Sequence, residues 1–249
     1  MSRFLAISLI FAALRVAGQS EMKTEQGFMF SPHYGLQIPG GDLKARFSNF
    51  SSIGMGVDYK FKNNLIIGVN YDWYFGNSVK DSGAFSGISG NSGLVIDQNG
   101  DFSVIRLNMQ GNYVSAHLGY LLNINKKERF SGIFMSGGVG VMQHKIDILS
   151  SELTIPQING EYEYGYDKLT YGLAVREYIG YQHFVNDSRY RFRIGVEFNQ
   201  GFTQGRRTWD FNANKSGLDK RLDLTTVFKI GVIVPVYTKN RADEEFFTD

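Results

Sequence analysis

The sequence has no cysteine, little proline and almost no net charge. Without cysteine, the chain can form neither a disulfide framework nor a thiolate metal site, and a cysteine nucleophile is excluded. The 26 basic and 24 acidic side chains give a net charge of +2, which provides no bulk attraction to nucleic acid. The 249 residues fit one domain, and 4 prolines beside 29 glycines and 14% aromatic residues favour strands joined by turns.

Long apolar runs are also missing. No segment after the N-terminus approaches the roughly 20 continuous apolar residues that a membrane-spanning helix needs, so a mature chain in a membrane must be a barrel. At the N-terminus, Arg3 precedes the apolar stretch 4–14 and the small residues Val16-Ala17-Gly18. This layout predicts a secretory signal peptide, residues 1–18, that is cleaved after Gly18. Because Arg15 lies close to the apolar stretch, an uncleaved anchor or a soluble N-terminal helix is the alternative.

Eight segments alternate between apolar and polar or small residues, as the two faces of a strand do. The segments are residues 27–38, 53–61, 65–75, 112–124, 131–144, 169–183, 189–201 and 222–237. The contrast is strongest where Phe192 and Ile194 alternate with Arg191 and Arg193. Glu177 falls on the apolar parity of its segment, which implies either a bulge or a contact with another protein.

The polarity of the two faces favours a membrane barrel over a soluble one. A soluble sandwich or barrel also alternates, but it places charge outside. Here the polar parity mixes charges with glycines such as Gly54, Gly56 and Gly195, and this mixture suits the narrow interior of eight strands. Aromatic residues of the apolar parity predict two girdles at the lipid headgroup levels. They are Phe28, Phe30, Tyr59, Phe61, Tyr120, Tyr181, Tyr190, Phe192 and Tyr237 at one end, and Trp73, Phe75 and Tyr171 at the other.

Short and long connections alternate strictly along the chain. The short ones are residues 62–64, 125–130 and 185–188, and the long ones are 39–51, 76–111, 145–168 and 202–221. Outer-membrane barrels have short periplasmic turns and longer outer loops, so we expect both termini in the periplasm. Asn99-Gly100 and Asn159-Gly160 are hairpin signals in two long connections, and they predict ribbons that extend the wall beyond the membrane.

These features predict an all-β fold: a single antiparallel up-and-down transmembrane β-barrel of about eight strands. The barrel is expected over residues 27–237, after a periplasmic segment, 19–26, and before a charged periplasmic tail, 238–249.

The export signal ending in Val-Ala-Gly-Gln, the strand sequence Ile66-Ile67-Gly68-Val69-Asn70-Tyr71 and the eight-strand spacing resemble a known group. They look like the small outer-membrane β-barrel proteins common in Bacteroidota. The resemblance covers residues 27–237 and rests on pattern rather than on a specific motif. Such barrels often finish at a terminal aromatic, whereas this chain continues past Tyr237. The resemblance implies the outer membrane of a Gram-negative cell envelope and no catalytic residues.

Charged residues on the polar parity form the first candidate site. They are Asp58, Lys60, Asp72, Arg176, Arg191, Arg193, Glu197, Asp223 and Lys229. These side chains could line an ion path or close into a salt-bridge network. We favour the network, because an eight-stranded barrel is too narrow for an open channel once such side chains fill it.

Two patterns could carry chemistry. Ser115 and His117 share the polar parity, as a hydroxyl nucleophile and its base would, but no third orienting group is identified. Residues 97–101 alternate acidic and amide side chains like a calcium loop. An EF-hand would need glycine and a carboxylate where Phe102 and Asn108 stand, so an ordinary turn is favoured. No metal or cofactor site is therefore expected.

Two segments could contact partners. The loop 202–221 holds Arg206, Arg207 and Trp209, which could bind lipopolysaccharide phosphates or a protein, although a solvated loop is the favoured expectation. The tail segment 241–247 ends in two phenylalanines that could dock a periplasmic partner, although disorder is the favoured expectation.

The sequence thus predicts a non-enzymatic outer-membrane protein with a structural, scaffold or accessory role. Its long outer loops would face partner proteins or ligands, and its partners would be outer-membrane lipid, lipopolysaccharide and other envelope proteins, not nucleic acid. The first alternative is a lipid-active enzyme that hydrolyses acyl chains of lipid A or phospholipid. The second is a porin-like pore for small solutes or ions. A soluble secreted β-sandwich is a further alternative, which would not lie in the membrane at all.

Overall fold

The computed structural model describes residues 26–80, 85, 95–103, 105–124, 130–150, 155, 158, 160–184 and 191–236. The predicted signal peptide, the predicted tail, Tyr190 and Tyr237 lie outside these residues, as does the segment 19–25. No helix in the described part of the chain is long and apolar enough to cross a membrane.

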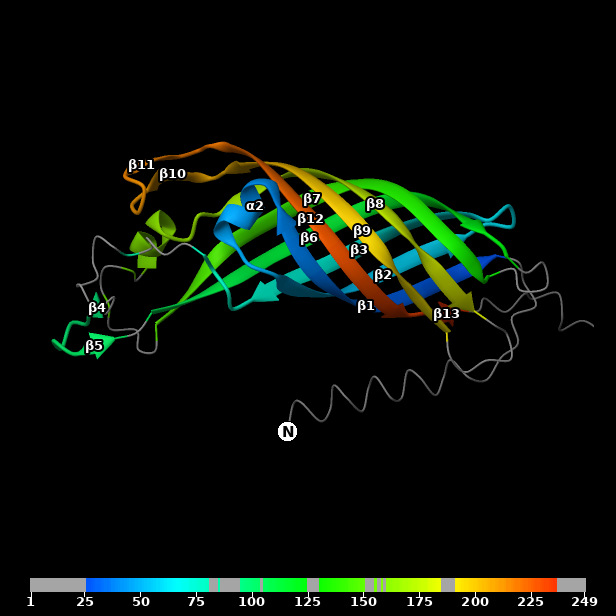
Figure 1. Ribbon diagram of the computed structural model, residues 1–249, viewed down its shortest axis with the longest axis horizontal. Coiled ribbons are helices and arrows are strands. Elements are labelled where there is room, and N and C mark those ends of the chain that lie inside the picture. Colours follow the sequence, from blue (N-terminus) through cyan, green and yellow to red (C-terminus); the bar gives the residue numbers. More distant parts are fainter. Residues whose placement is uncertain are drawn as a thin grey trace, which may run out of the picture.

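Eight strands form a closed antiparallel barrel, in which each strand is hydrogen-bonded to the next along the chain (Figure 1). They are β1 (Gly27–Gly40), β2 (Phe50–Lys60), β3 (Leu65–Gly76), β6 (Ile105–Leu122), β7 (Gly132–Ser150), β8 (Thr170–Phe184), β9 (Arg191–Gly205) and β12 (Lys220–Val232). The barrel closes where β12 pairs with β1, with His33 opposite Gly231. After Ile233, β13 (Val234–Val236) continues the pairing with β1. The predicted fold class is confirmed.

The two ends of the barrel differ. At the turn end, short connections join β2 to β3, β6 to β7 and β8 to β9, and both β1 begins and β13 ends there. The loop end carries the smaller elements, which group together in Figure 1. They are α2 (Gly41–Arg46), β4 (Val95–Ile96), β5 (Phe102–Ser103), η2 (Gly160–Gly165), β10 (Arg207–Asp210) and β11 (Lys215–Gly217).

The long connections are structured, but only partly as predicted. Asn99-Gly100 lies in the turn between β4 and β5, where Gly100 has a φ of 87°. Asn159 lies outside the described residues, but the hairpin predicted at Asn159-Gly160 is wrong, because the residues from Gly160 to Gly165 form the 3₁₀ helix η2 instead of a strand. Asn-Gly produces a hairpin only where the flanking residues pair as strands. At the end of η2, the N–H groups of Tyr166 and Asp167 both donate to the Glu163 carbonyl, as in a helical turn.

Two wall strands are longer than the sequence predicted. β6 and β7 pair from Leu122 opposite Ile133 at the turn end to Ile105 opposite Ser150. This extension carries the wall past the predicted strand ends at Asn112 and His144.

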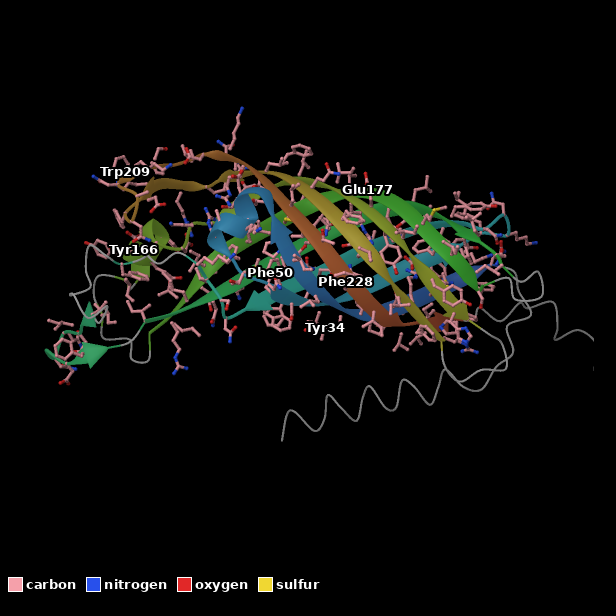
Figure 2. All side chains as sticks on the ribbon, viewed as in Figure 1. Tyr34, Phe50, Tyr166, Glu177, Trp209 and Phe228 are labelled. Atoms are coloured by element: carbon pink, nitrogen blue, oxygen red, sulfur yellow. The ribbon has the colours of Figure 1, made fainter. Side chains whose placement is uncertain are left out.

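Side chains alternate across the wall with the apolar set outward. On β9, Phe192 and Ile194 are 36% and 49% exposed, whereas Arg191 is 6% exposed. Figure 2 shows Phe228 and Glu177 on wall strands, away from the loop end where Trp209 lies. The barrel therefore turns hydrocarbon outward and charge inward, the reverse of a soluble barrel.

Glu177 interrupts the apolar outer surface without interrupting the strand. It lies opposite Gly137 on β7 and Phe198 on β9, and the register continues on both sides without a shift. A bulge, the first of the two explanations offered for this residue, is therefore wrong, because a bulge would place two residues opposite one.

Candidate functional site

Side chains fill the interior of the barrel in three layers. An apolar cluster closes the turn end, an ion network occupies the middle, and a second apolar cluster closes the loop end. The turn-end cluster is Met29, Ile66, Leu121, Phe130, Phe134, Tyr178, Phe184 and Ile233. The loop-end cluster is Leu43, Phe47, Phe50, Tyr74, Met109, Tyr113, Met142, Ile146 and Ala174.

The order of residues along single strands fixes these layers. On β3 the inward side chains run from Ile66 in the turn-end cluster through Asn70 and Asp72 to Tyr74 in the loop-end cluster. The sequence predicted a polar or small interior throughout, so the apolar layers are a difference from expectation. Hydrocarbon near both mouths excludes water from the charges between, which strengthens their interactions and makes an unpaired charge expensive.

Lys229 is at the centre of the ion network. Its Nζ lies 3.0 Å from Glu197 Oε2 and 3.2 Å from Asp72 Oδ1. Arg176 Nη2 donates to the same Glu197 oxygen at 2.5 Å. All four side chains are at least nine-tenths buried, so each charge depends on the others for its solvation.

A second group of contacts joins this centre through His117. Asp58 lies 2.8 Å from Arg193 Nη1 and 3.1 Å from His117 Nε2. The other ring nitrogen of His117 lies 2.9 Å from Asn70 Nδ2 and 3.3 Å from Arg176 Nη1. Asp58, Asp72 and Glu197 are therefore matched by the three permanent cations of the network, and His33 adds a contact of 2.9 Å to Asp72.

Six of the nine predicted lumen charges meet in this network and three do not. Lys60 and Arg191 lie in the turn-end half, where they sit over the rings of Phe130 and Phe184 at 4.7 and 4.8 Å. Asp223 lies near the loop end, 2.9 Å from His144 and 3.1 Å from Arg221. Sequence reasoning missed His33, His144 and Asn70 as members of these clusters, although all three lie on the inward parity of their strands.

The structure does not assemble a hydrolase site from Ser115 and His117. Both ring nitrogens of His117 face Asp58, Asn70 and Arg176, and none of its recorded contacts is to a hydroxyl. In the described part of the chain, no group of three or more histidine, aspartate or glutamate side chains is placed to hold a metal ion. Asp97 instead accepts hydrogen bonds from the backbone N–H groups of Asn99 and Asp101, at 2.8 and 2.9 Å, in a local turn.

Three long connections pack on one another at the loop end, and we call this assembly the platform. A small apolar cluster joins Phe85 and Val95 of one connection to Ile155 and Ile158 of the next. The backbone N–H of Phe85 also donates to Asn212 Oδ1 at 2.9 Å. The platform is thus a folded unit rather than a set of separate loops.

Arg207 anchors the β10–β11 hairpin to the platform. Its Nε donates to Asp167 Oδ1 at 2.8 Å while Nη2 donates to Oδ2, and its guanidinium lies 4.2 Å from the Tyr164 ring. The hydrogen bond and charge of Asp167 raise the pKa of Arg207 above its usual value, so this group stays cationic at physiological pH.

The platform leaves aromatic side chains exposed. Trp209 is 45% exposed and Phe211 46%, and Tyr162 and Tyr164 are exposed nearby on η2. Of the predicted contact residues, Arg206 alone turns toward the wall, where its guanidinium lies 3.8 Å from the ring of Tyr171.

An apolar outer wall around an interior that side chains fill in the described strands defines this protein as a transmembrane β-barrel. The sequence matches no protein-family model and no curated protein.

Several solved barrels are similar in structure. Neisserial surface protein A has a TM-score of 0.47 and 12% identity over 84% of this chain and 97% of that one. Ail of Yersinia pestis has a TM-score of 0.45 and 12% identity over 83% and 98%. The outer membrane protein OprG of Pseudomonas aeruginosa has a TM-score of 0.37 and 11% identity over 84% and 95%. At this distance the likeness assigns no function, and the Bacteroidota resemblance stays a prediction.

Proposed function

We propose that the protein is a non-enzymatic outer-membrane scaffold whose plugged barrel holds the platform at the cell surface for a partner protein or ligand. The observation that carries this proposal is the platform itself, in which connections far apart in the sequence pack together and leave Trp209, Phe211 and Tyr162 exposed. Tryptophan, tyrosine and arginine are enriched where binding energy concentrates in interfaces. A folded, aromatic surface suits recognition better than a solvated loop does.

The apolar outer surface and the lengths of the connections support the proposed location. The outward apolar side chains of strands such as β9 and β12 would be unfavourably exposed in water, whereas lipid acyl chains can cover them. Short turns at one end and the platform at the other match the periplasmic and outer sides of such barrels. We therefore place both termini in the periplasm and the platform outside, after cleavage of the signal peptide.

Arg206 supports a contact with anionic lipid. It is exposed, stacks on Tyr171 of the loop-end girdle and donates to the Tyr171 carbonyl at 3.3 Å. A guanidinium at the level of the girdle can contact the phosphates of lipopolysaccharide, because arginine binds phosphate through paired hydrogen bonds.

The pore and the enzyme have less support. The ion network and both apolar clusters occupy the interior along its length, which leaves little room for a water-filled path. His117 is buried among charged partners and faces no hydroxyl nucleophile. Pure protein in planar bilayers should give no stable conductance, and reproducible single-channel steps would favour the pore instead.

The decisive experiment is purification of the full chain from native outer membranes in mild detergent, with quantitative mass spectrometry. We expect a protein that copurifies with the wild type and is lost at least about tenfold with Trp209→Ala. Thr208→Ala, an exposed neighbour on β10, is the matched control and should retain the partner. Recovery of the barrel alone from native cells would contradict the scaffold role.

A further inference from the structure

Glu177 carries a carboxylate on the lipid-facing side of the barrel wall. It is exposed, and its outward neighbours on β8, Val175 and Ile179, are apolar. Phe198 lies opposite it on β9. Figure 2 shows it on the wall, well away from the loop-end elements.

The depth of Glu177 places it within the hydrocarbon region. On the same strand, the outward aromatics Tyr171 and Tyr181 mark the loop-end and turn-end girdles. Glu177 is six residues from Tyr171 and four from Tyr181. At about 2.5 Å of barrel height per residue in a tilted strand, this puts it roughly 15 Å and 10 Å from the two girdles. A glutamate side chain is too short to reach either headgroup level.

A hollow lies beside this carboxylate. Gly137 stands directly opposite Glu177 on β7, and a side chain added to Gly137 would point into open space. A shallow hollow of about 520 Å³ in the wall has Gly137 and Glu177 in its lining. Leu118, Met135, Ile179 and Phe198 line its apolar part. We call this feature the Glu177 notch.

The described part of the barrel offers no partner to the Glu177 carboxylate in the notch. None of the recorded hydrogen bonds or ion pairs of the described residues involves Glu177, and between the girdles no described strand carries an outward lysine or arginine. Acyl chains offer no donors, and a charged or polar group in hydrocarbon costs several kcal/mol unless it is paired. Lipid amines stay at the headgroup level. The described strands of a second copy would bring no cation to this depth either.

We propose that the Glu177 notch docks a membrane-embedded protein partner that inserts a lysine or arginine side chain beside the carboxylate. Charge complementarity selects the cation, and the apolar rim receives the stem of the long side chain, which Lys and Arg bury readily. The site is separate from the platform, so it gives the scaffold a second, lateral contact within the membrane.

A photo-cross-linking amino acid in the full chain, expressed in its native cell, tests this proposal. The probe replaces Leu118, which pairs with Gly137 on the rim of the notch. The control probe replaces Met55 on β2, which lies four strands from Glu177 on β8 in either direction around the barrel. Met55 lies four residues from its girdle residue Tyr59, as Glu177 lies from Tyr181.

We expect a protein adduct from the Leu118 position and none from the Met55 position. The adduct should fall at least about tenfold with Glu177→Leu and with Gly137→Leu, which fills the notch and keeps the carboxylate. The cross-linked peptide should contain a lysine or arginine. Exchanging that residue for glutamate should restore the adduct when combined with Glu177→Lys. Equal adducts at both positions, adducts with lipid alone, or no effect of Glu177→Leu would overturn the proposal.

Unfolding in pure phosphatidylcholine vesicles, where no partner exists, gives an independent readout. There the urea midpoint of Glu177→Leu should shift upward, because leucine suits lipid better than an unpaired carboxylate. A downward shift would mean that Glu177 stabilises the barrel itself, and it would also overturn the docking site. This readout does not depend on the platform, so failure of the scaffold proposal and failure of the notch are distinguishable.

Discussion

Lys229 on β12 and Glu197 on β9 form an ion pair inside the barrel, with Nζ 3.0 Å from Oε2 and side chains only 8% and 1% exposed. Asp72 contacts the same ammonium group, with Oδ1 3.2 Å from Nζ. One cation thus serves two carboxylates, and the balance of three carboxylates against three permanent cations depends on it.

Lys229→Met should lower the free energy of unfolding by about 3–5 kcal/mol, because it leaves an excess of buried negative charge. The double variant Lys229→Met/Glu197→Gln should recover much of this loss, since it restores the balance of charge. Urea unfolding in phospholipid vesicles, followed by tryptophan fluorescence, measures both. Lys220→Met, at an exposed position of the same strand, should change stability by less than about 0.5 kcal/mol. Equal effects of Lys220→Met and Lys229→Met would contradict the network.

Gly68→Ala should destabilise the barrel by about 1–3 kcal/mol through overpacking. A Cβ at this position would collide with the Asp58 carboxylate and the His117 ring, which lie against the glycine. The same unfolding measurement applies. Gly137→Ala is the control, because its Cβ would meet nothing within 4 Å, and an equal loss in both variants would count against this packing.

Leu43→Ala should lower stability by about 2–4 kcal/mol, the usual loss for a buried leucine. Leu43 of α2 is fully buried and closes the loop-end cluster. Its neighbour Lys44 is exposed, so Lys44→Ala should be close to neutral. If Leu43→Ala also left stability unchanged, α2 would not contribute to closing the loop end of the barrel.

Arg207→Lys should loosen the β10–β11 hairpin, because a lysine cannot reproduce the two parallel hydrogen bonds to Asp167. We expect limited proteolysis within the hairpin to accelerate by roughly tenfold, with the barrel intact. Lys215→Ala removes an ion pair to Asp219 whose side chains are 60% and 62% exposed, and it should have little effect. Unchanged cleavage of Arg207→Lys would show that other contacts hold the hairpin.

Much of the wall could be predicted from local pattern. Phe192 and Arg191 are neighbours in sequence on opposite faces of β9. Alternation separated the two faces, and the mixture of charges with glycines on the polar face assigned that face to the interior. Strand ends were less predictable, since β6 begins at Ile105, seven residues before the predicted start at Asn112. That extension depends on pairing with β7 rather than on any local signal.

The interior was less predictable than the wall. Parity marks a residue as inward, but it does not give its height in the barrel or the residues that it faces. Lys60 and Lys229 therefore looked equivalent in the sequence, whereas one lies over Phe130 and the other joins Glu197. The sequence did not show that Ile66 belongs to the turn-end cluster and Tyr74 to the loop-end cluster. An apolar side chain at an inward position does not indicate which other side chains it packs against.

The sequence by itself determined which side chains share a face of each strand, because a repeat of two residues is a property of each strand alone. The glycines mixed with charges on the polar face indicated that this face lies inside. Tertiary structure decided which charges pair and where the interior closes. Lys229 and Asp72, 157 residues apart, meet only because barrel closure and strand stagger bring β12 and β3 to the same height.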